Sequence, residues 1–375
     1  MKRIGDLNLF LVLSLFFLPL LIHASPETFP TPPQQPATGP GGKDYRHAEV
    51  IKSVYGEGDR QYWIFEPAKP APKSAPLIVF NHGWSAMNPK TYGAWIDHLV
   101  KRGNIVVYPR YQANLRTSTK KFTQNAIQAV KDAILQLQKG NHVKPQLDKF
   151  AIVGHSAGGQ VTANMAALAS SSGLPAPKAI MCVQPGKTWA KKEKAIIPLT
   201  DLSTIPGQVL MLTVVGDRDN IARDIDAKKI FYQTPQIPLS NKDFITLVSD
   251  EHGKPPLIAN HFAPAAVDES YDSGEATESR KKSSPLRSIF RERLRERISK
   301  RRKADDSDFK EIKDTANSVN ALDYYGLWKL FDALCDAAFY GKNRVYALGN
   351  TPAQRFMGKW SDGTPVKELI VTDNP

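Results

Sequence analysis

Short apolar runs alternate with amphipathic segments along the chain, and this alternation constrains the fold more than any other feature of the sequence. The later runs are nearly continuous in Val, Ile and Leu, which is typical of strands buried on both faces of a parallel sheet. The two earliest runs alternate polar and apolar residues, as strands at an antiparallel edge do. Strands are predicted at residues 48–55, 61–66, 76–81, 104–109, 149–153, 178–184, 208–215 and 243–249.

Helical patterns separate the later strands. The segments TYGAWIDHLVKRG and FTQNAIQAVKDAILQLQKG repeat apolar residues at helical spacing, and they end at Gly103 and Gly140. A third helix is expected directly after Ser156, and a last apolar helix at about 321–340 precedes the strand-like VKELIVTD. Strands that alternate with helices of this length predict an α/β fold, with a mostly parallel eight-stranded sheet and helices on both faces.

The first 25 residues have the pattern of a secretory signal peptide. Lys2 and Arg3 precede an uncharged apolar run that is too short for a comfortable membrane span, and Ala24 suits signal-peptidase cleavage. We therefore expect residues 1–25 to be removed and the protein to be exported to the periplasm or the extracellular space. An uncleaved N-terminal anchor is the alternative. Residues 26–44 are dense in Pro and Gly, which predicts an extended linker.

One domain is expected after this linker. With 41% hydrophobic residues the chain can build a sizeable core, and no internal repeat divides residues 45–375. From 266 to 320 the apolar pattern gives way to Ser, Asp, Glu, Lys and Arg, which predicts a flexible insertion before the last helix. Cys182 and Cys335 both lie in apolar segments, which favours two buried thiols at least as much as one disulfide.

The basic charge of the protein is concentrated in this insertion. Residues 280–303 hold twelve Lys or Arg against two Glu, and so carry most of the net charge of +13. Apolar side chains recur there every four residues, at Leu286, Phe290, Leu294 and Ile298. Such a helix would suit an anionic membrane surface or an acidic partner helix, although the short stripe favours a solvated insertion. Few aromatic residues accompany the charge, which argues against nucleic-acid binding.

The stretch KFAIVGHSAGG places a serine between a predicted strand and a predicted helix. A nucleophile elbow needs this order of strand, G-x-S-x-G and helix, because a sharp turn exposes the serine at the carboxyl edge of the sheet. Gly154 and Gly158 would allow close backbone approach, and the amides after Ser156 would serve as oxyanion donors. Because G-x-S-x-G alone is common, a purely structural turn serine is the alternative.

Two further strand ends carry matching chemistry. The third strand ends in NHGW, where the backbone amide of Trp84 would complete an oxyanion hole with the amide of Ala157. The seventh strand is followed by GDRDNIA, where Asp219 has left the strand far enough to reach a histidine. Asp217 is expected to bond the turn backbone instead.

Two histidines compete for the role of general base. The eighth strand is followed by SDEHGKPPLIANHFAP. His252 comes three residues after the strand, close to the sheet edge where Ser156 is expected, whereas His261 follows a Pro-Pro loop. We therefore prefer His252 and keep His261 as the alternative base. His82 and His155 are expected to be packed side chains.

The chain order Ser156, Asp219, His252 over residues 48–264 resembles the α/β-hydrolase superfamily. The motifs GHSAGG, NHGW, GDRDNIA and SDEHG carry this resemblance, which is nearest to cutinases and dienelactone-hydrolase-like esterases. The resemblance implies a Ser-His-Asp triad that cleaves small-molecule or lipid esters through an acyl-enzyme, with no metal and no organic cofactor. The Pro-rich start and the basic insertion depart from a minimal cutinase-like chain.

Two other functions stay open on the sequence alone. A serine peptidase of the same fold would use the same three residues. A non-catalytic envelope or membrane-interaction protein would keep the hydrolase scaffold and act through residues 280–303.

Overall fold

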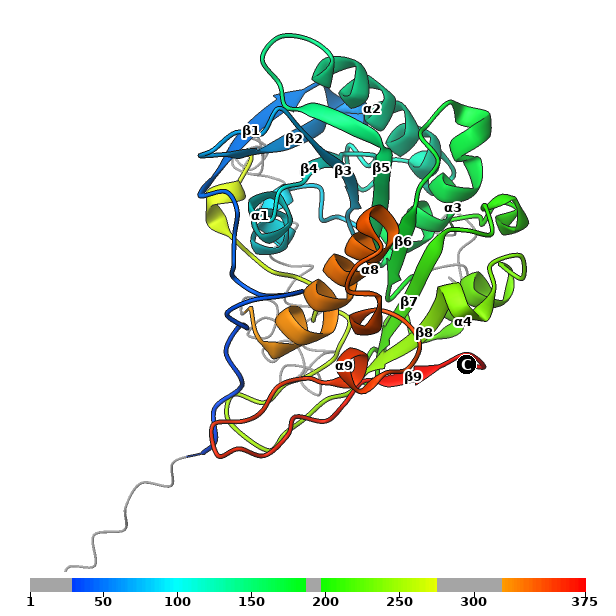
Figure 1. The fold of residues 1–375 in the computed structure, drawn as a ribbon. Helices are drawn as coiled ribbons and strands as arrows, with labels where there is room; N and C mark the ends of the chain where they lie inside the picture. Colours follow the sequence, from blue (N-terminus) through cyan, green and yellow to red (C-terminus); the bar gives the residue numbers. More distant parts are fainter. Residues whose placement is uncertain (1–28, 187–196, 275–318) are drawn as a thin grey trace, which may run out of the picture.

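A mixed sheet at the centre of the protein has nine strands in the described part of the chain, in the order β1-β2-β4-β3-β5-β6-β7-β8-β9 (Figure 1). The computed structural model describes residues 29–186, 197–274 and 319–375. The strands are β1 (Glu49–Tyr55), β2 (Tyr62–Ala68), β3 (Ser74–Asn81), β4 (Ile105–Pro109), β5 (Lys144–His155), β6 (Ala179–Val183), β7 (Leu210–Gly216), β8 (Lys242–Leu247) and β9 (Ile370–Thr372).

The central strands from β4 to β8 run parallel, and β1, β2 and β9 pair antiparallel with their neighbours. All eight predicted strands are present, and the strand-like VKELIVTD adds β9 at one edge. The mostly parallel α/β fold is therefore confirmed.

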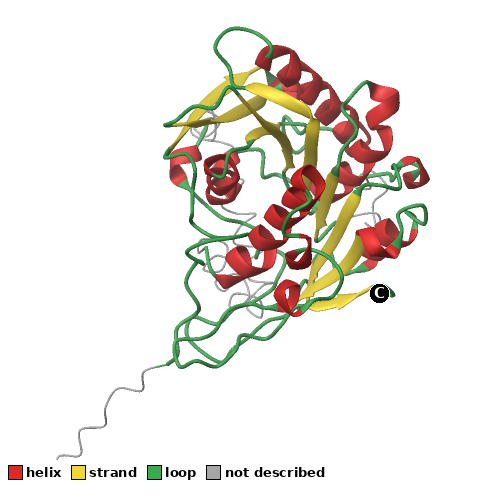
Figure 2. Cartoon of the chain, in the orientation of Figure 1, coloured by secondary structure: helices red, strands yellow, loops and turns green. Residues whose placement is uncertain are grey.

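Helices cover both faces of the sheet (Figure 2). The α-helices are α1 (Gly93–Lys101), α2 (Phe122–Leu137), α3 (Ala157–Ser172), α4 (Ile225–Tyr232), α8 (Lys329–Tyr340) and α9 (Pro352–Arg355), and the π-helix η8 (Leu322–Trp328) leads into α8. Short 3-10 turns are η1 (Gly58–Arg60), η2 (Pro89–Tyr92), η3 (Thr119–Lys121), η5 (Leu202–Thr204), η6 (Leu239–Asn241), η7 (Glu269–Tyr271) and η9 (Arg344–Tyr346).

Each face of the sheet has its own hydrophobic core. α1 and α8 contribute to one core, and α2, α3 and α4 contribute to the other. Successive residues of β3 alternate between them, because strand side chains point to opposite faces: Ile78 and Phe80 belong to the first core, Leu77 and Val79 to the second. Burial on both faces explains why these strands read as continuous apolar runs.

Residues 29–44 have neither helix nor strand, as their composition predicts, but they pack against the domain and do not form an extended linker. The backbone amide of Gly41 donates to the buried carboxylate of Asp332 on α8 at 2.8 Å. The carbonyl of Pro30 accepts from the amide of Lys254 at 2.9 Å. Residues 29–44 are termed the N-terminal strap below.

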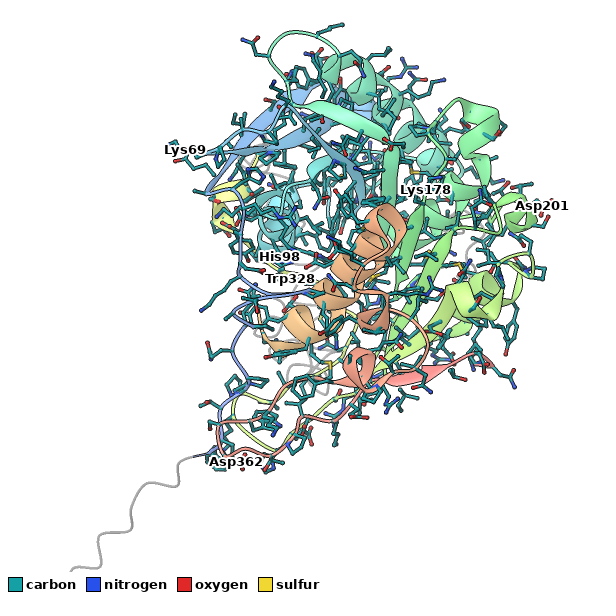
Figure 3. The ribbon with its side chains drawn as sticks, viewed as in Figure 1. Lys69, His98, Lys178, Asp201, Trp328 and Asp362 are labelled. Carbon is teal, nitrogen blue, oxygen red and sulfur yellow. The ribbon has the colours of Figure 1, made fainter. Side chains whose placement is uncertain are left out.

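A buried polar cluster around Asp332 anchors this strap to α8. Besides Gly41, the carboxylate of Asp332 accepts from His98 Nε2 at 2.9 Å and from Arg102 Nε at 3.1 Å. The rings of His98 and Trp328 stack with centroids 4.5 Å apart, and Figure 3 labels both residues. Burial raises the pKa of Asp332, but its interactions with His98, Arg102 and the Gly41 amide outweigh burial, so the carboxyl pKa lies below its usual value.

The first residues of the predicted insertion belong to the folded domain. Residues 266–274 pack on the protein: the carbonyl of Ala266 accepts from the amide of Ala94 at 2.9 Å, and Tyr271 is buried. The basic segment 280–303 lies outside the described residues, and so does the predicted signal peptide.

Cys182 and Cys335 are both free and buried, so of the two arrangements left open by the sequence the structure has the two thiols. Within the described ranges, no helix combines the length and the apolar character needed to cross a membrane.

Candidate active site

Ser156 occupies the sharp turn between β5 and α3. Its backbone has φ 56° and ψ −122°, a conformation that non-glycine residues rarely adopt and that persists only where the surroundings enforce it. Two glycines make the turn fit. A Cβ on Gly158 would lie 2.1 Å from the carbonyl oxygen of Asn81, and a Cβ on Gly154 would lie 2.2 Å from that of Gly158. The elbow expected from G-x-S-x-G is therefore the conformation observed.

His261 lies between Ser156 and Asp219. Its Nε2 is 2.9 Å from Ser156 Oγ, and its Nδ1 is 2.8 Å from Asp219 Oδ2. An ionised carboxylate can only accept, so Nδ1 carries the proton and Nε2 is left to accept from the serine hydroxyl. All three residues are buried, with 5–6% of each exposed.

Backbone amides that follow Asp219 in the sequence hold its carboxylate beside Nδ1 of His261. Its Oδ1 accepts from the amides of Ile221 and Ala222, both at 2.8 Å, which leaves Oδ2 for the imidazole. Burial raises the pKa of Asp219, but the bond from His261 and the two amides outweigh burial, so the pKa lies below its usual value. The carboxylate is thus ionised at neutral pH.

The preference for His252 as the base is wrong, because His261 and not His252 bonds Ser156 and Asp219. His252 Nε2 bonds the carboxylate of Asp362 at 2.7 Å, and its side chain is 37% exposed at the surface. Closeness in sequence to the end of β8 misled the prediction, because the chain leaves the sheet edge at this point and comes back before His261.

The excursion that carries His252 away is a small hairpin. The amides and carbonyls of Asp250 and Leu257 bond each other reciprocally at 2.8 Å, so the intervening residues form its tip. The returning strand is then fastened beside the site: the amide of Ala259 donates to Ser249 Oγ at 2.9 Å, and Gln184 Nε2 donates to the carbonyl of Asn260 at 2.8 Å. The turn sequence HGKPP was the available signal for this hairpin.

Asp217 serves the turn, as the sequence suggests. Its two carboxylate oxygens accept from the backbone amide of Ser249 at 2.9 Å and from the hydroxyl of the same residue at 2.5 Å. It therefore supports the start of the hairpin and does not contact His261.

The NHGW loop lies against the nucleophile. A Cβ placed on Gly83 would sit 3.4 Å from Ser156 Cβ. The amides of Trp84 and Ala157 bond no acceptor in the described part of the chain, so both are available as donors beside Ser156. The indole of Trp84 packs on Phe122 with ring centroids 5.6 Å apart.

Two buried histidines flank the site without joining it. Burial lowers the pKa of His82 to about 4 and that of His155 to about 3, so both rings are neutral at physiological pH. His82 stacks on Tyr111, and the ring of His155 lies 4.9 Å from that of His261. A neutral His155 does not compete with His261 for the serine proton.

Two side chains near the NHGW loop carried no functional signal in the sequence. Tyr92 falls on the apolar side of a helical pattern, and Gln112 follows a strand as an ordinary loop residue. In the structure both side chains bond backbone amides of the loop. Over residues 29–186, 197–274 and 319–375, no group of three or more His, Cys, Asp or Glu side chains is placed to hold a metal ion.

Residues 49–206 match the family model described as Chlorophyllase, a family of α/β-hydrolase-type serine esterases. The mostly parallel sheet with helices on both faces is that of the α/β-hydrolase fold. The match indicates a serine ester hydrolase and covers the stretch that contains Trp84 and Ser156. The match spans less than half of the chain and ends before Asp219 and His261, so the positions of these two residues come from the structure alone. No curated protein matches the chain.

Proposed function

We propose that this α/β-hydrolase cleaves carboxylic esters, with Ser156 as nucleophile, His261 as general base and Asp219 as the residue that orients the base. The observation that carries the proposal is the His261 imidazole, which lies within hydrogen-bond distance of both Ser156 Oγ and Asp219 Oδ2. The match to a serine esterase family supports the same class of reaction. The substrate is a small-molecule or lipid ester.

Acylation begins at the serine hydroxyl. His261 Nε2 takes the hydroxyl proton while Ser156 Oγ bonds the ester carbonyl carbon, and the carbonyl oxygen becomes an oxyanion. The backbone amides of Trp84 and Ala157 donate to this oxyanion. Asp219 stabilises the imidazolium that has formed. The carbon–oxygen bond to the alcohol then breaks, and the imidazolium returns its proton to the leaving alcohol.

Deacylation repeats these steps with water. His261 takes a proton from a water molecule as its oxygen attacks the acyl-enzyme carbonyl, and the same two amides hold the second oxyanion. Collapse of this intermediate releases the carboxylic acid, and His261 returns the proton to Ser156 Oγ.

A nucleophile variant tests the proposal. Ser156→Ala should lower the turnover of short p-nitrophenyl esters by at least about 10⁴-fold, because the remaining groups cannot form an acyl-enzyme. A fluorophosphonate probe should label the wild-type protein at Ser156 with release of fluoride, and should not label the variant. Wild-type turnover in Ser156→Ala, or absence of labelling in the wild type, would contradict the assignment and would favour a non-catalytic role.

A serine peptidase is the nearest rival, because it would use the same geometry. The family match favours esters. Parallel assays on an ester and on the amide of the same acyl group decide between them: ester turnover without amide turnover supports the proposal. Chlorophyll belongs in the ester panel, because the matched family is described as Chlorophyllase.

We further propose that the protein is exported. For its basic segment, contact with anionic membranes is the alternative to a segment that only adds charge for solubility. The N-terminal sequence supports export, since a charged start, an apolar run and a small residue precede the strap. The first residue of the mature protein, read by mass spectrometry, tests cleavage near Ala24. Co-sedimentation with phosphatidylserine vesicles, with and without residues 280–303, tests the membrane contact, and equal binding would refute it.

A further inference from the structure

Three consecutive backbone amides of the NHGW loop, those of Gly83, Trp84 and Ser85, differ in their hydrogen-bond partners. The amide of Gly83 donates to the hydroxyl of Tyr92 at 3.0 Å, and the amide of Ser85 donates to Gln112 Oε1 at 2.8 Å. The amide of Trp84 lies between them and bonds no acceptor among the described residues. Side chains therefore occupy the two outer donors and leave the middle one for a ligand.

The carbonyl groups of the loop are held in the same manner. The hydroxyl of Tyr111 donates to the carbonyl of His82, and the hydroxyl of Tyr108 donates to that of Ala86 at 2.5 Å. The carbonyl of Gly83 accepts from the amide of Ala86 at 3.0 Å, which closes the turn. The loop is thus bonded at both ends and on both sides of Trp84.

The loop also contains backbone strain that needs such support. Ser85 has φ 65°, a left-handed conformation that non-glycine residues rarely adopt. A residue in this conformation persists only where neighbouring bonds over-determine it, and the bond from its amide to Gln112 is one of these. Without this bond the strained conformation at Ser85, next to the Trp84 amide, loses one of its supports.

Tyr92 links the loop to the nucleophile elbow. Its oxygen accepts from Gly83, and the same hydroxyl lies 2.8 Å from Nδ1 of His155, the residue before Ser156. The Gly83 amide can only donate, so the tyrosine proton is available for His155 Nδ1. Burial keeps His155 neutral, with a pKa lowered to about 3, so that its Nδ1 can accept this bond.

We propose that Tyr92 and Gln112 are positioning residues for the oxyanion hole: by engaging the amides of Gly83 and Ser85, they set the distance and direction of the free Trp84 amide relative to Ser156 Oγ. Oxyanion donors stabilise the transition state only when they are fixed in place before the charge develops. The inference rests on the proposed esterase function.

Two variants break the two contacts independently. Tyr92→Phe removes the hydroxyl, and Gln112→Met removes the acceptor, each with little change in volume. Tyr271→Phe is the matched control, because Tyr271 is also buried and its hydroxyl bonds Asp97 at 3.0 Å instead of the loop. Measurements are kcat and KM on p-nitrophenyl butyrate, the inhibition constant of phenylboronic acid, whose serine adduct resembles the tetrahedral intermediate, and the thermal midpoint.

We expect each variant to lower kcat by about 10- to 100-fold, part of the loss caused by removing an oxyanion donor, with KM within about threefold of wild type. The affinity for phenylboronic acid should fall in parallel. The pH at which activity is half-maximal should stay unchanged, since His261 keeps its partners. Tyr271→Phe should retain kcat within about twofold.

A merely structural role for the two side chains would give a different result. If a folded Tyr92→Phe or Gln112→Met retains wild-type kcat and boronate affinity, the inference is wrong, and should one variant fail to fold, the other decides. Ser156→Ala, assayed alongside, separates this failure from that of the esterase proposal. Loss of activity only in Ser156→Ala overturns the positioning role alone, whereas full activity in Ser156→Ala overturns the proposed function.

Discussion

At the scale of single residues, the site depends on side chains of one type being given different tasks by their surroundings. Asp217 and Asp219 follow the same strand, two residues apart. The first accepts from Ser249 and holds the turn, whereas the second accepts from His261 and two backbone amides. Position relative to the imidazole, and not residue type, separates the catalytic candidate from the structural one.

This difference predicts opposite results for one substitution at the two positions. Asp219→Asn should lower kcat by about 10³- to 10⁴-fold, because an amide can donate to Nδ1 and so stabilise the wrong tautomer of His261. Asp217→Asn should keep kcat within about threefold and lower the thermal midpoint instead, because it weakens only the bonds to Ser249. Equal losses of activity in the two variants, measured on one p-nitrophenyl ester, would contradict the assignment of Asp219.

At the scale of elements, the sequence predicts each strand and the positions of Ser156 and Asp219 because these depend on local patterns. An apolar run specifies a buried strand, and the first residues after it must lie at the sheet edge. The histidine is different, because a hairpin of unknown length intervenes between β8 and His261. Its return depends on bonds to Ser249 and Gln184, which lie in other segments, and distance along the chain could not reveal them.

The helix that covers the sheet contains a second element-scale feature, a carboxyl group buried in η8. Asp323 Oδ2 accepts from the amide of Asn320 at 2.9 Å, and its Oδ1 has no partner among the described residues. Burial raises the pKa of Asp323 to about 8 from an ordinary value of 3.8. The folded protein therefore holds this proton more tightly than the unfolded chain does.

The resulting pH dependence has a definite sign. As pH rises from about 4 to about 8, the unfolded chain releases the Asp323 proton first, so the free energy of unfolding falls by about 1.4 kcal/mol per pH unit at most. Asp323→Asn removes this loss. Its stability relative to wild type should increase across that range by a few kcal/mol and level off above pH 8. Urea denaturation at several pH values measures it, and a constant difference would refute the buried carboxyl.

At the scale of the whole molecule, the N-terminal strap is held in place by contacts with residues that are distant in the sequence. Gly41 bonds Asp332, 291 residues away, and the same carboxylate holds His98 and Arg102. The composition of residues 29–44 predicts the lack of helix and strand correctly. It cannot predict packing, because the surface that receives the strap is assembled only when α1 and α8 come together.

The strap anchor should therefore contribute to global stability. Asp332→Ala removes one buried acceptor that His98, Arg102 and the amide of Gly41 share, and should lower the free energy of unfolding by about 3 kcal/mol. Glu49→Gln is the control, because its pair with Lys69 is exposed and should matter by less than about 0.5 kcal/mol. Denaturant titrations compare the two, and similar small effects would show that the anchor is not structural.

The proposed mechanism depends most on the identity of the general base, and one comparison tests it directly. kcat/KM on p-nitrophenyl butyrate is measured for His261→Gln and His252→Gln under the same conditions. His261 bridges Ser156 and Asp219, whereas His252 bonds Asp362 at the surface. His261→Gln should lose at least about 10⁴-fold in kcat/KM, and His252→Gln should change it by less than about threefold. A large loss in His252→Gln with activity retained in His261→Gln would contradict the proposed mechanism.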